Sequence, residues 1–86
     1  MQEKRRVMLR IAGKEIVLMS EDENAYLKRL EDFTNRRINE TAMAARQPVS
    51  AVGTICTLAM ADELLKAQDE NRRLRIELDR LRKGEA

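Results

Sequence analysis

Histidine is absent from this chain of 86 residues, and cysteine occurs only once, at Cys56. Without histidine and with a single cysteine, the chain cannot assemble the ligand set of a structural zinc site. A glycine-rich phosphate loop and a nucleophilic serine elbow are missing as well. The sequence therefore predicts a protein that is not an enzyme and that binds no metal or cofactor.

Long hydrophobic runs are also missing. No window approaches the roughly 18 apolar residues of a membrane-spanning helix, and residues 1–6 lack the apolar core of a secretory signal. Cys56 lies in an apolar run, which predicts a buried thiol in a reducing compartment. We therefore expect a cytoplasmic protein that does not enter a membrane.

The net charge of the chain is small compared with its number of charged residues. Charged residues make up 37% of the chain, but 17 basic and 15 acidic residues leave a net charge of only +2. A leucine-zipper transcription factor has a basic helix directly before its zipper. In this chain the corresponding segment, 49–59, carries no charge. These features predict a soluble helical surface that does not bind nucleic acid.

The N-terminal part predicts a β-hairpin at about 5–19. Val7, Leu9 and Ile11 alternate with Met8, Arg10 and Ala12, and a Gly13-Lys14 turn leads to a second apolar run. Ile16 and Leu18 should join the same face, which an adjacent helix must cover.

A helix is predicted at about 21–44. Ser20 and Glu23 have the spacing of a capping box, in which each side chain bonds the backbone amide of the other residue. The apolar positions with helical spacing are Leu27, Leu30, Phe33, Ile38 and Ala42, with Tyr26 beside them. The polar positions on or beside the solvent face are Lys28, Glu31, Asp32, Asn35, Arg36 and Asn39.

Pro48 ends that helix, and a second helix is predicted from about residue 50 to about Lys83. Gly53 would disfavour the interior of this helix, so either the helix begins after it or another backbone approaches there.

The second helix carries a heptad repeat, the a/d seam. Its a positions are Leu64, Asn71 and Leu78, and its d positions are Met60, Ala67, Leu74 and Leu81. Every g position is glutamate, and Glu70 and Glu77 would meet Arg75 and Arg82 at the e positions of a parallel partner. Asn71 also favours two parallel strands in one register. The alternative is a single solvated helix with mixed charges.

A second stripe predicts further assembly. Leu65 and Ile76 are eleven residues apart and therefore share a helix face, about 100° from the a/d seam. If this stripe packs against another dimer with antiparallel stalks, the result is a tetramer with heads at both ends; the alternative is that Ile76 is simply exposed.

These elements together predict an α+β protein, with a head at 1–59 and a coiled-coil stalk at 60–86. The hairpin residues Ile11 to Ile16, the capped helix and the segment Leu58 to Leu64 resemble the ZapA family of bacterial cell-division proteins, over about residues 7–83. The Ala-Asp-Glu-Leu sequence that enters the coil is the most specific part of this resemblance.

The resemblance implies a partner, the tubulin-like division GTPase FtsZ, whose filaments the protein would bundle at the division site. It implies dimers through head and coil, and pairs of dimers through the coils. It also suggests basic contacts on the head at Lys14, Arg37 and Arg46. A homodimeric regulator or adaptor that binds another protein is the alternative.

Overall fold

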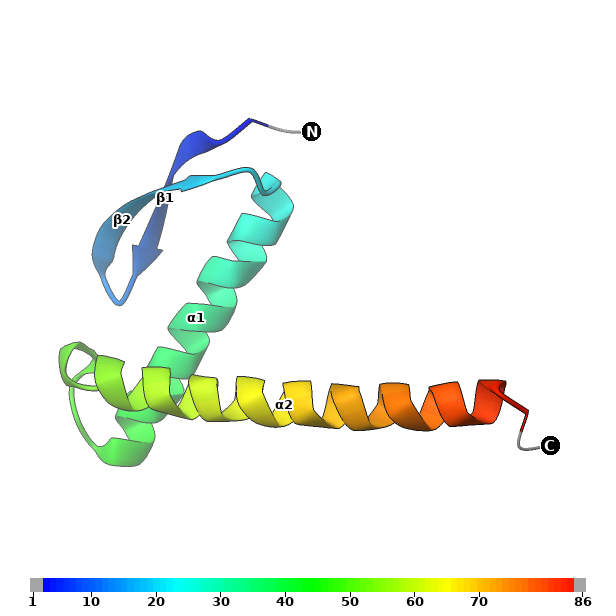
Figure 1. The fold of residues 1–86 in the computed structure, drawn as a ribbon. Helices are drawn as coiled ribbons and strands as arrows, with labels where there is room; N and C mark the ends of the chain where they lie inside the picture. Colours follow the sequence, from blue (N-terminus) through cyan, green and yellow to red (C-terminus); the bar gives the residue numbers. More distant parts are fainter. Residues whose placement is uncertain (1–2, 85–86) are drawn as a thin grey trace. The chain divides into compact units, whose positions relative to one another are not determined.

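The computed structural model describes residues 3–84, which form a hairpin followed by two helices (Figure 1). The elements are β1 (Arg5–Ile11), β2 (Lys14–Ser20), α1 (Asn24–Ala45), the 3-10 turn η1 (Val49–Ala51) and α2 (Gly53–Arg82). The α+β class, the hairpin and the order of the two helices are as predicted.

The hairpin is antiparallel, and Leu9 pairs with Ile16 and Val7 with Leu18. Residues directly opposite each other share one face, so the predicted inner face of the sheet is confirmed. The turn is not the predicted Gly13-Lys14 pair, because Lys14 already pairs with Ile11 as the first residue of β2. Ala12 and Gly13 form the turn with φ values of 54° and 80°, the signature of a type I′ turn.

The capping box at Ser20 was a wrong prediction. Ser20 is the last residue of β2, and its hydroxyl oxygen accepts from the backbone N–H of Asp22 at 2.9 Å. Glu23 is the N-cap residue of α1, and its side chain makes no capping bond. The Ser20 hydroxyl is used in a local turn two residues long, which moves the start of the helix to Asn24.

The helix α1 ends in a left-handed cap at Arg46, with φ 55° and ψ 44°. The backbone N–H of Gln47 closes the cap on the carbonyl of Ala42 at 3.0 Å. Pro48 then leads into η1, and α2 begins at Gly53 and not near residue 50. Gly53 is thus the first residue of the helix, where it avoids the penalty of a glycine in a helix interior.

The core is small and lies between the hairpin, α1 and the residues around η1. Its buried apolar side chains are Leu9, Leu27, Ala42, Val52 and Cys56. Cys56 is buried and forms no disulfide, so its predicted place in the core is confirmed. Ile38 is half-buried, while Leu30 and Phe33 of the predicted apolar face are exposed.

The chain divides into two compact units, residues 1–56 and residues 57–86. The boundary falls inside α2. The second unit consists of the remaining turns of α2, and its described side chains after Met60 are exposed.

Candidate partner-binding surfaces

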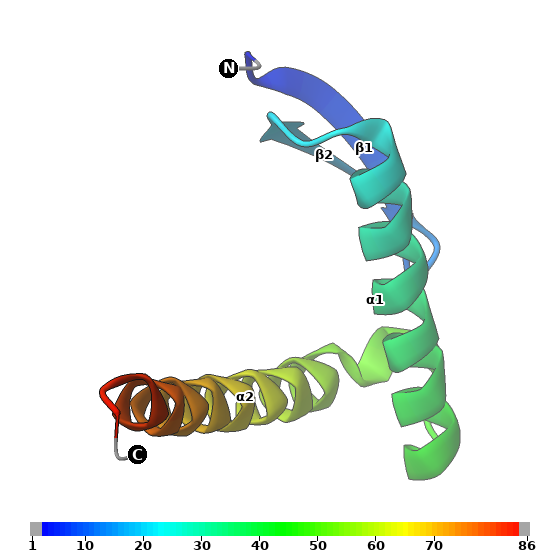
Figure 2. The ribbon, with the colours of Figure 1, turned by 90° about the vertical axis from the view of Figure 1, so that its right-hand side faces the viewer.

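Two polar side chains of α1 hold the outer edge of β1. Glu31 Oε2 accepts from the backbone N–H of Arg10 at 2.6 Å. Asn35 Oδ1 accepts from the N–H of Ala12 at 2.9 Å, and Asn35 Nδ2 donates to the carbonyl of Arg10 at 2.8 Å. Both ribbon views show β1 beside the N-terminal half of α1 (Figure 1 and Figure 2).

This arrangement corrects the predicted face of the helix. Glu31 and Asn35 were expected on or beside the solvent face, yet both turn toward the hairpin. The reason is that α1 meets a strand edge, whose backbone N–H and C=O groups need hydrogen-bonding partners and not apolar ones. Apolar periodicity alone could not reveal this.

A cleft of about 430 Å³ lies beside the hairpin turn, between β1, α1 and Val49. Its basic residues are Arg10 and Lys28, which the sequence analysis did not select as site residues. Arg10 pairs with Glu15 at 3.2 Å, and Lys28 pairs with Asp32 at 3.2 Å as the spacing predicts. Hydrogen bonding to Asp32 raises the pKa of Lys28 above its ordinary value. The cleft is therefore polar and already contains paired charges.

The predicted basic contacts all lie in the first compact unit. Lys14 is exposed directly after the turn that borders the cleft. Arg37 is half-buried on α1, where its carbonyl accepts from the Thr41 hydroxyl at 2.8 Å. Arg46 is exposed at the left-handed cap. The three lie in one unit, at the start of β2, on α1 and at the C-cap of α1.

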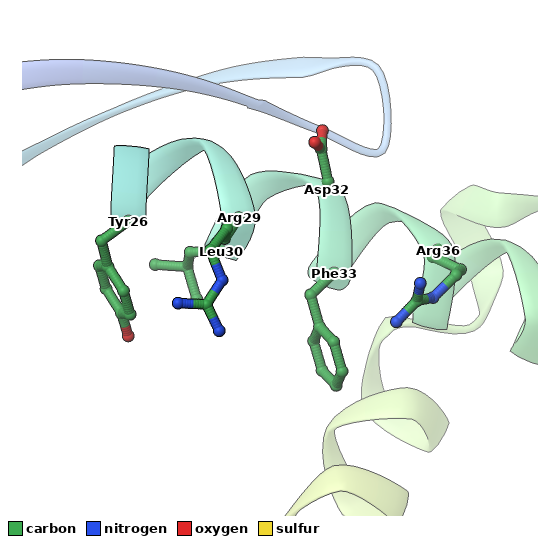
Figure 3. Close-up of a pocket in the computed structure, with 6 residues that line it drawn as sticks. All are labelled: Tyr26, Arg29, Leu30, Asp32, Phe33 and Arg36. Carbon is green, nitrogen blue, oxygen red and sulfur yellow. The ribbon is translucent and has the colours of Figure 1, made fainter. Parts of the chain in front are cut away.

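An apolar stripe on α1 is a second candidate surface. Tyr26, Leu30 and Phe33 remain 46%, 38% and 42% exposed. They point to the same side of α1, whereas Asp32 points to the opposite side (Figure 3). Arg29 and Arg36 border the stripe, and the Arg36 guanidinium carbon lies 5.5 Å from the centre of the Phe33 ring. Such a mixture of aromatic and arginine side chains is typical of protein interfaces.

The a/d seam of α2 is an exposed apolar feature of the second unit. Leu64, Leu74 and Leu78 are 57%, 48% and 48% exposed, and Leu81 is exposed too. Ala67 and Asn71 are also exposed, while Met60 is half-buried. The predicted tetramer residues Leu65 and Ile76 are exposed on the same helix.

Charged side chains of α2 pair along the helix. Arg73 donates to Glu70 Oε2 at 2.5 Å and to Glu77 Oε2 at 3.2 Å. The hydrogen bond from Arg73 lowers the pKa of Glu70. Both glutamates are g residues of the heptad, so Arg73 competes within the chain for the carboxylates that a parallel partner would meet with Arg75 and Arg82.

Residues 3–84 contain no candidate site of two other kinds. No group of histidine, cysteine, aspartate and glutamate in that range could hold a metal ion. Within the same range, no helix has the length and apolar character needed to cross a membrane.

Comparison with known proteins gives two matches. A family model described as cell division protein ZapA matches residues 7–84. A solved structure, a ZapA mutant dimer from Geobacillus stearothermophilus, is 28% identical, with a TM-score of 0.65 over 92% of this chain and 93% of that chain. No curated protein matches the chain.

The fold and its surfaces define a small hairpin-and-helix protein whose exposed features suit contacts with other proteins. The family model covers nearly the whole chain, so the chain belongs to the ZapA family of cell-division proteins. The resemblance inferred from the hairpin and the Leu58–Leu64 segment is thereby confirmed.

Proposed function

We propose that this chain is a non-enzymatic protein that binds FtsZ and cross-links its filaments, promoting assembly of the division ring. The proposal places it in the cytoplasm at the division site. Membership of the ZapA family supports the role in division. The observation that carries the cross-linking role is the exposed a/d seam, because a row of leucines along a solvated helix requires a partner helix.

The first step of assembly is a parallel homodimer through α2. In this dimer the seam from Met60 to Leu81 is buried, and the glutamates at g meet arginines at e. Antiparallel pairing would oppose glutamate to glutamate and arginine to arginine. The solved relative is described as a dimer, which supports this state, and the α1 stripe offers a further contact between heads.

The second step joins two dimers through Leu65 and Ile76, with the stalks antiparallel. Heads then lie at both ends of the assembly, so one particle can hold two filaments. Avidity compensates for a weak contact at each head, because the second contact forms at high effective concentration.

The filament contacts are assigned to Lys14, Arg37 and Arg46 on the head. Arg46 is informative because its backbone is left-handed, a conformation in which a residue with a Cβ is strained by about 1–2 kcal/mol. Glycine would form the same cap without this strain, so the helix end does not explain an arginine there. An exposed cation at this position is suited to recognising an acidic protein surface.

Co-sedimentation with polymerising FtsZ tests the proposal. Wild-type protein should enter the pellet with the polymer and increase the mass of bundled filaments. The double variant Lys14→Glu with Arg46→Glu should bind at least about tenfold more weakly, while its circular dichroism stays unchanged.

A matched control is Lys66→Glu with Arg80→Glu, which changes the net charge equally on the solvent-facing c positions of α2. This control should co-sediment as the wild type does. If wild-type protein stays in the supernatant at low and moderate salt, the FtsZ proposal is wrong and the adaptor alternative gains support. If both double variants weaken binding equally, only the assignment of the head residues is wrong.

A further inference from the structure

The two edges of the hairpin are occupied differently. Glu31 and Asn35 bind the outer edge of β1 at its turn end, through the backbone groups of Arg10 and Ala12. The sheet of the described residues contains only β1 and β2, so no third strand of this chain pairs with the outer edge of β2. A strand edge that is open in this way is a template for another strand.

The register identifies which groups of β2 point outward. Arg10 gives its N–H and its carbonyl to α1, so its pair with Glu15 is not a hydrogen-bonded pair of the hairpin. Bonded and non-bonded pairs alternate along an antiparallel ladder. Glu15, Val17 and Met19 therefore direct their backbone N–H and C=O groups away from β1.

Two common devices that block a strand edge are absent from β2, and its only charged residues, Lys14 and Glu15, lie at its start. Between Lys14 and Ser20 the strand has no proline, and its pairing with β1 runs without a bulge. Natural edge strands often use such devices to prevent pairing. Val17 and Met19 are 51% and 57% exposed on the outer face, and Ile16 is 41% exposed on the inner face. Both faces of the open edge thus carry incompletely covered apolar side chains.

We propose that β2 pairs antiparallel with β2 of a second copy, about a two-fold axis through Val17, so that two hairpins form one four-stranded sheet. In this register the residues with outward backbone groups lie opposite each other. Val17 faces Val17, and Glu15 of one copy faces Met19 of the other. The sheet then has β1 at each edge, and α1 of the same chain binds each of those edges at its turn end.

The strand is complementary to itself in this register. Glu15 lies opposite Met19, Ile16 opposite Leu18, and Lys14 opposite Ser20, so no like charges face each other across the two copies. The two Val17 side chains would meet at the centre, and Ile16 would gain cover from Leu18 of the other copy. Main-chain bonds provide the affinity and these side chains select the register.

A second copy is the favoured occupant because the pairing is two-fold symmetric and the solved relative is a dimer. The inference rests on the proposed homodimer and does not depend on FtsZ binding. A parallel coil brings two heads to the same end, which raises the effective concentration of one β2 near the other.

A cysteine cross-link tests the axis. Residues of a bonded antiparallel pair have Cα atoms about 5.5 Å apart, within the range of a disulfide. Val17→Cys should therefore form a disulfide-linked dimer under mild oxidation. Met8→Cys is the control, because Met8 is exposed on the same face of β1 but its two copies would be three strand spacings, about 14 Å, apart. Wild-type protein, whose cysteine is the buried Cys56, is the control for cross-linking through that residue.

The outcomes separate the inference from the proposals on which it rests. A dimeric or tetrameric mass by light scattering, with at least about tenfold faster cross-linking of Val17→Cys than of Met8→Cys, supports the paired strands. A dimer or tetramer in which Val17→Cys is not cross-linked, or is cross-linked no faster than Met8→Cys, overturns the β2 pairing alone. A monomeric mass overturns the homodimer together with the pairing.

Hydrogen exchange provides a second measurement without an added thiol. The amides of Glu15 and Met19 should exchange slowly in wild type and at least about tenfold faster in Val17→Pro. Because the N–H of Val17 points outward, proline there leaves the hairpin ladder intact, and the amides of Ile16 and Leu18 serve as the control. Rapid exchange of Glu15 and Met19 in wild type would contradict the proposed sheet.

Discussion

Asn35 donates its side-chain N–H to the carbonyl of Arg10 at 2.8 Å, and its oxygen accepts from the N–H of Ala12 at 2.9 Å. One amide thus ties the middle of α1 to the end of β1. Only this orientation of the amide satisfies both backbone groups, since its oxygen cannot donate and its nitrogen cannot accept.

Asn35→Ala is expected to destabilise the head by about 1–3 kcal/mol, because it leaves two backbone groups without partners. Denaturant unfolding followed by circular dichroism measures this. Asn39→Ala, an exposed asparagine on the next turn of the same helix, should change the free energy of unfolding by less than about 0.5 kcal/mol. Equal losses in the two variants would show that Asn35 does not anchor the hairpin.

The hairpin turn should respond in opposite directions to two substitutions. Ala12 has a positive φ that asparagine adopts more readily, so Ala12→Asn should stabilise the protein by about 0.5–1 kcal/mol. Gly13→Ala should destabilise it by about 1–2 kcal/mol, since φ is 80° and the space around the added Cβ is open, which leaves backbone strain as the only cost. Thermal melts of the pair provide the measurement, and the same sign of change in both would contradict a type I′ turn.

Asn71→Leu should raise the melting temperature of the proposed coil and allow it to form more than one oligomeric state. The reason is that a polar residue that specifies register is replaced by an apolar one. Melts combined with light scattering measure both effects. A clear drop in melting temperature would show that Asn71 is not an a position.

The Glu70–Arg73 pair predicts a pH dependence. Arg73 lowers the pKa of Glu70 in the folded helix, from an ordinary value of 4.5. A lowered carboxyl pKa adds stability above the unfolded value, and this stability is lost as the pH falls through the folded value. Arg73→Gln should therefore have a lower melting temperature than wild type at pH 7, and the difference should shrink in acid.

The effect should be small, because both side chains are exposed. Arg80→Gln removes the same charge from α2 and provides the control. A difference between wild type and Arg73→Gln that persists unchanged in acid would show that the pair with Glu70 is not its source.

Ile76→Glu should reduce the proposed tetramer to a dimer. A buried carboxylate would be unpaired at the contact between dimers, while the a/d seam through Leu74 and Leu78 keeps each dimer folded. Light scattering on the eluting protein measures the mass. Either a wild-type dimer or a tetramer that survives the substitution would refute the role of Ile76.

Local patterns sufficed for much of the fold. Alternation from Val7 to Leu18 predicts the strands and their inner face, Pro48 marks the end of α1, and the heptad predicts the long helix. Each signal depends on neighbours within a few residues, so it can be read from the chain alone. Family membership follows from the same local segments.

The sequence by itself determined the element types, their order and the faces of the hairpin. Only the tertiary structure decided that Glu31 and Asn35 bind β1, that Ser20 turns away from a capping box, and that Leu30 and Phe33 stay exposed. The contacts of Glu31 and Asn35 depend on which edge of the hairpin α1 approaches, whereas Ser20 belongs to the end of β2, where it pairs with Arg5. The backbone groups on that edge need hydrogen bonds, and a contact across more than twenty residues leaves no periodic trace in the sequence.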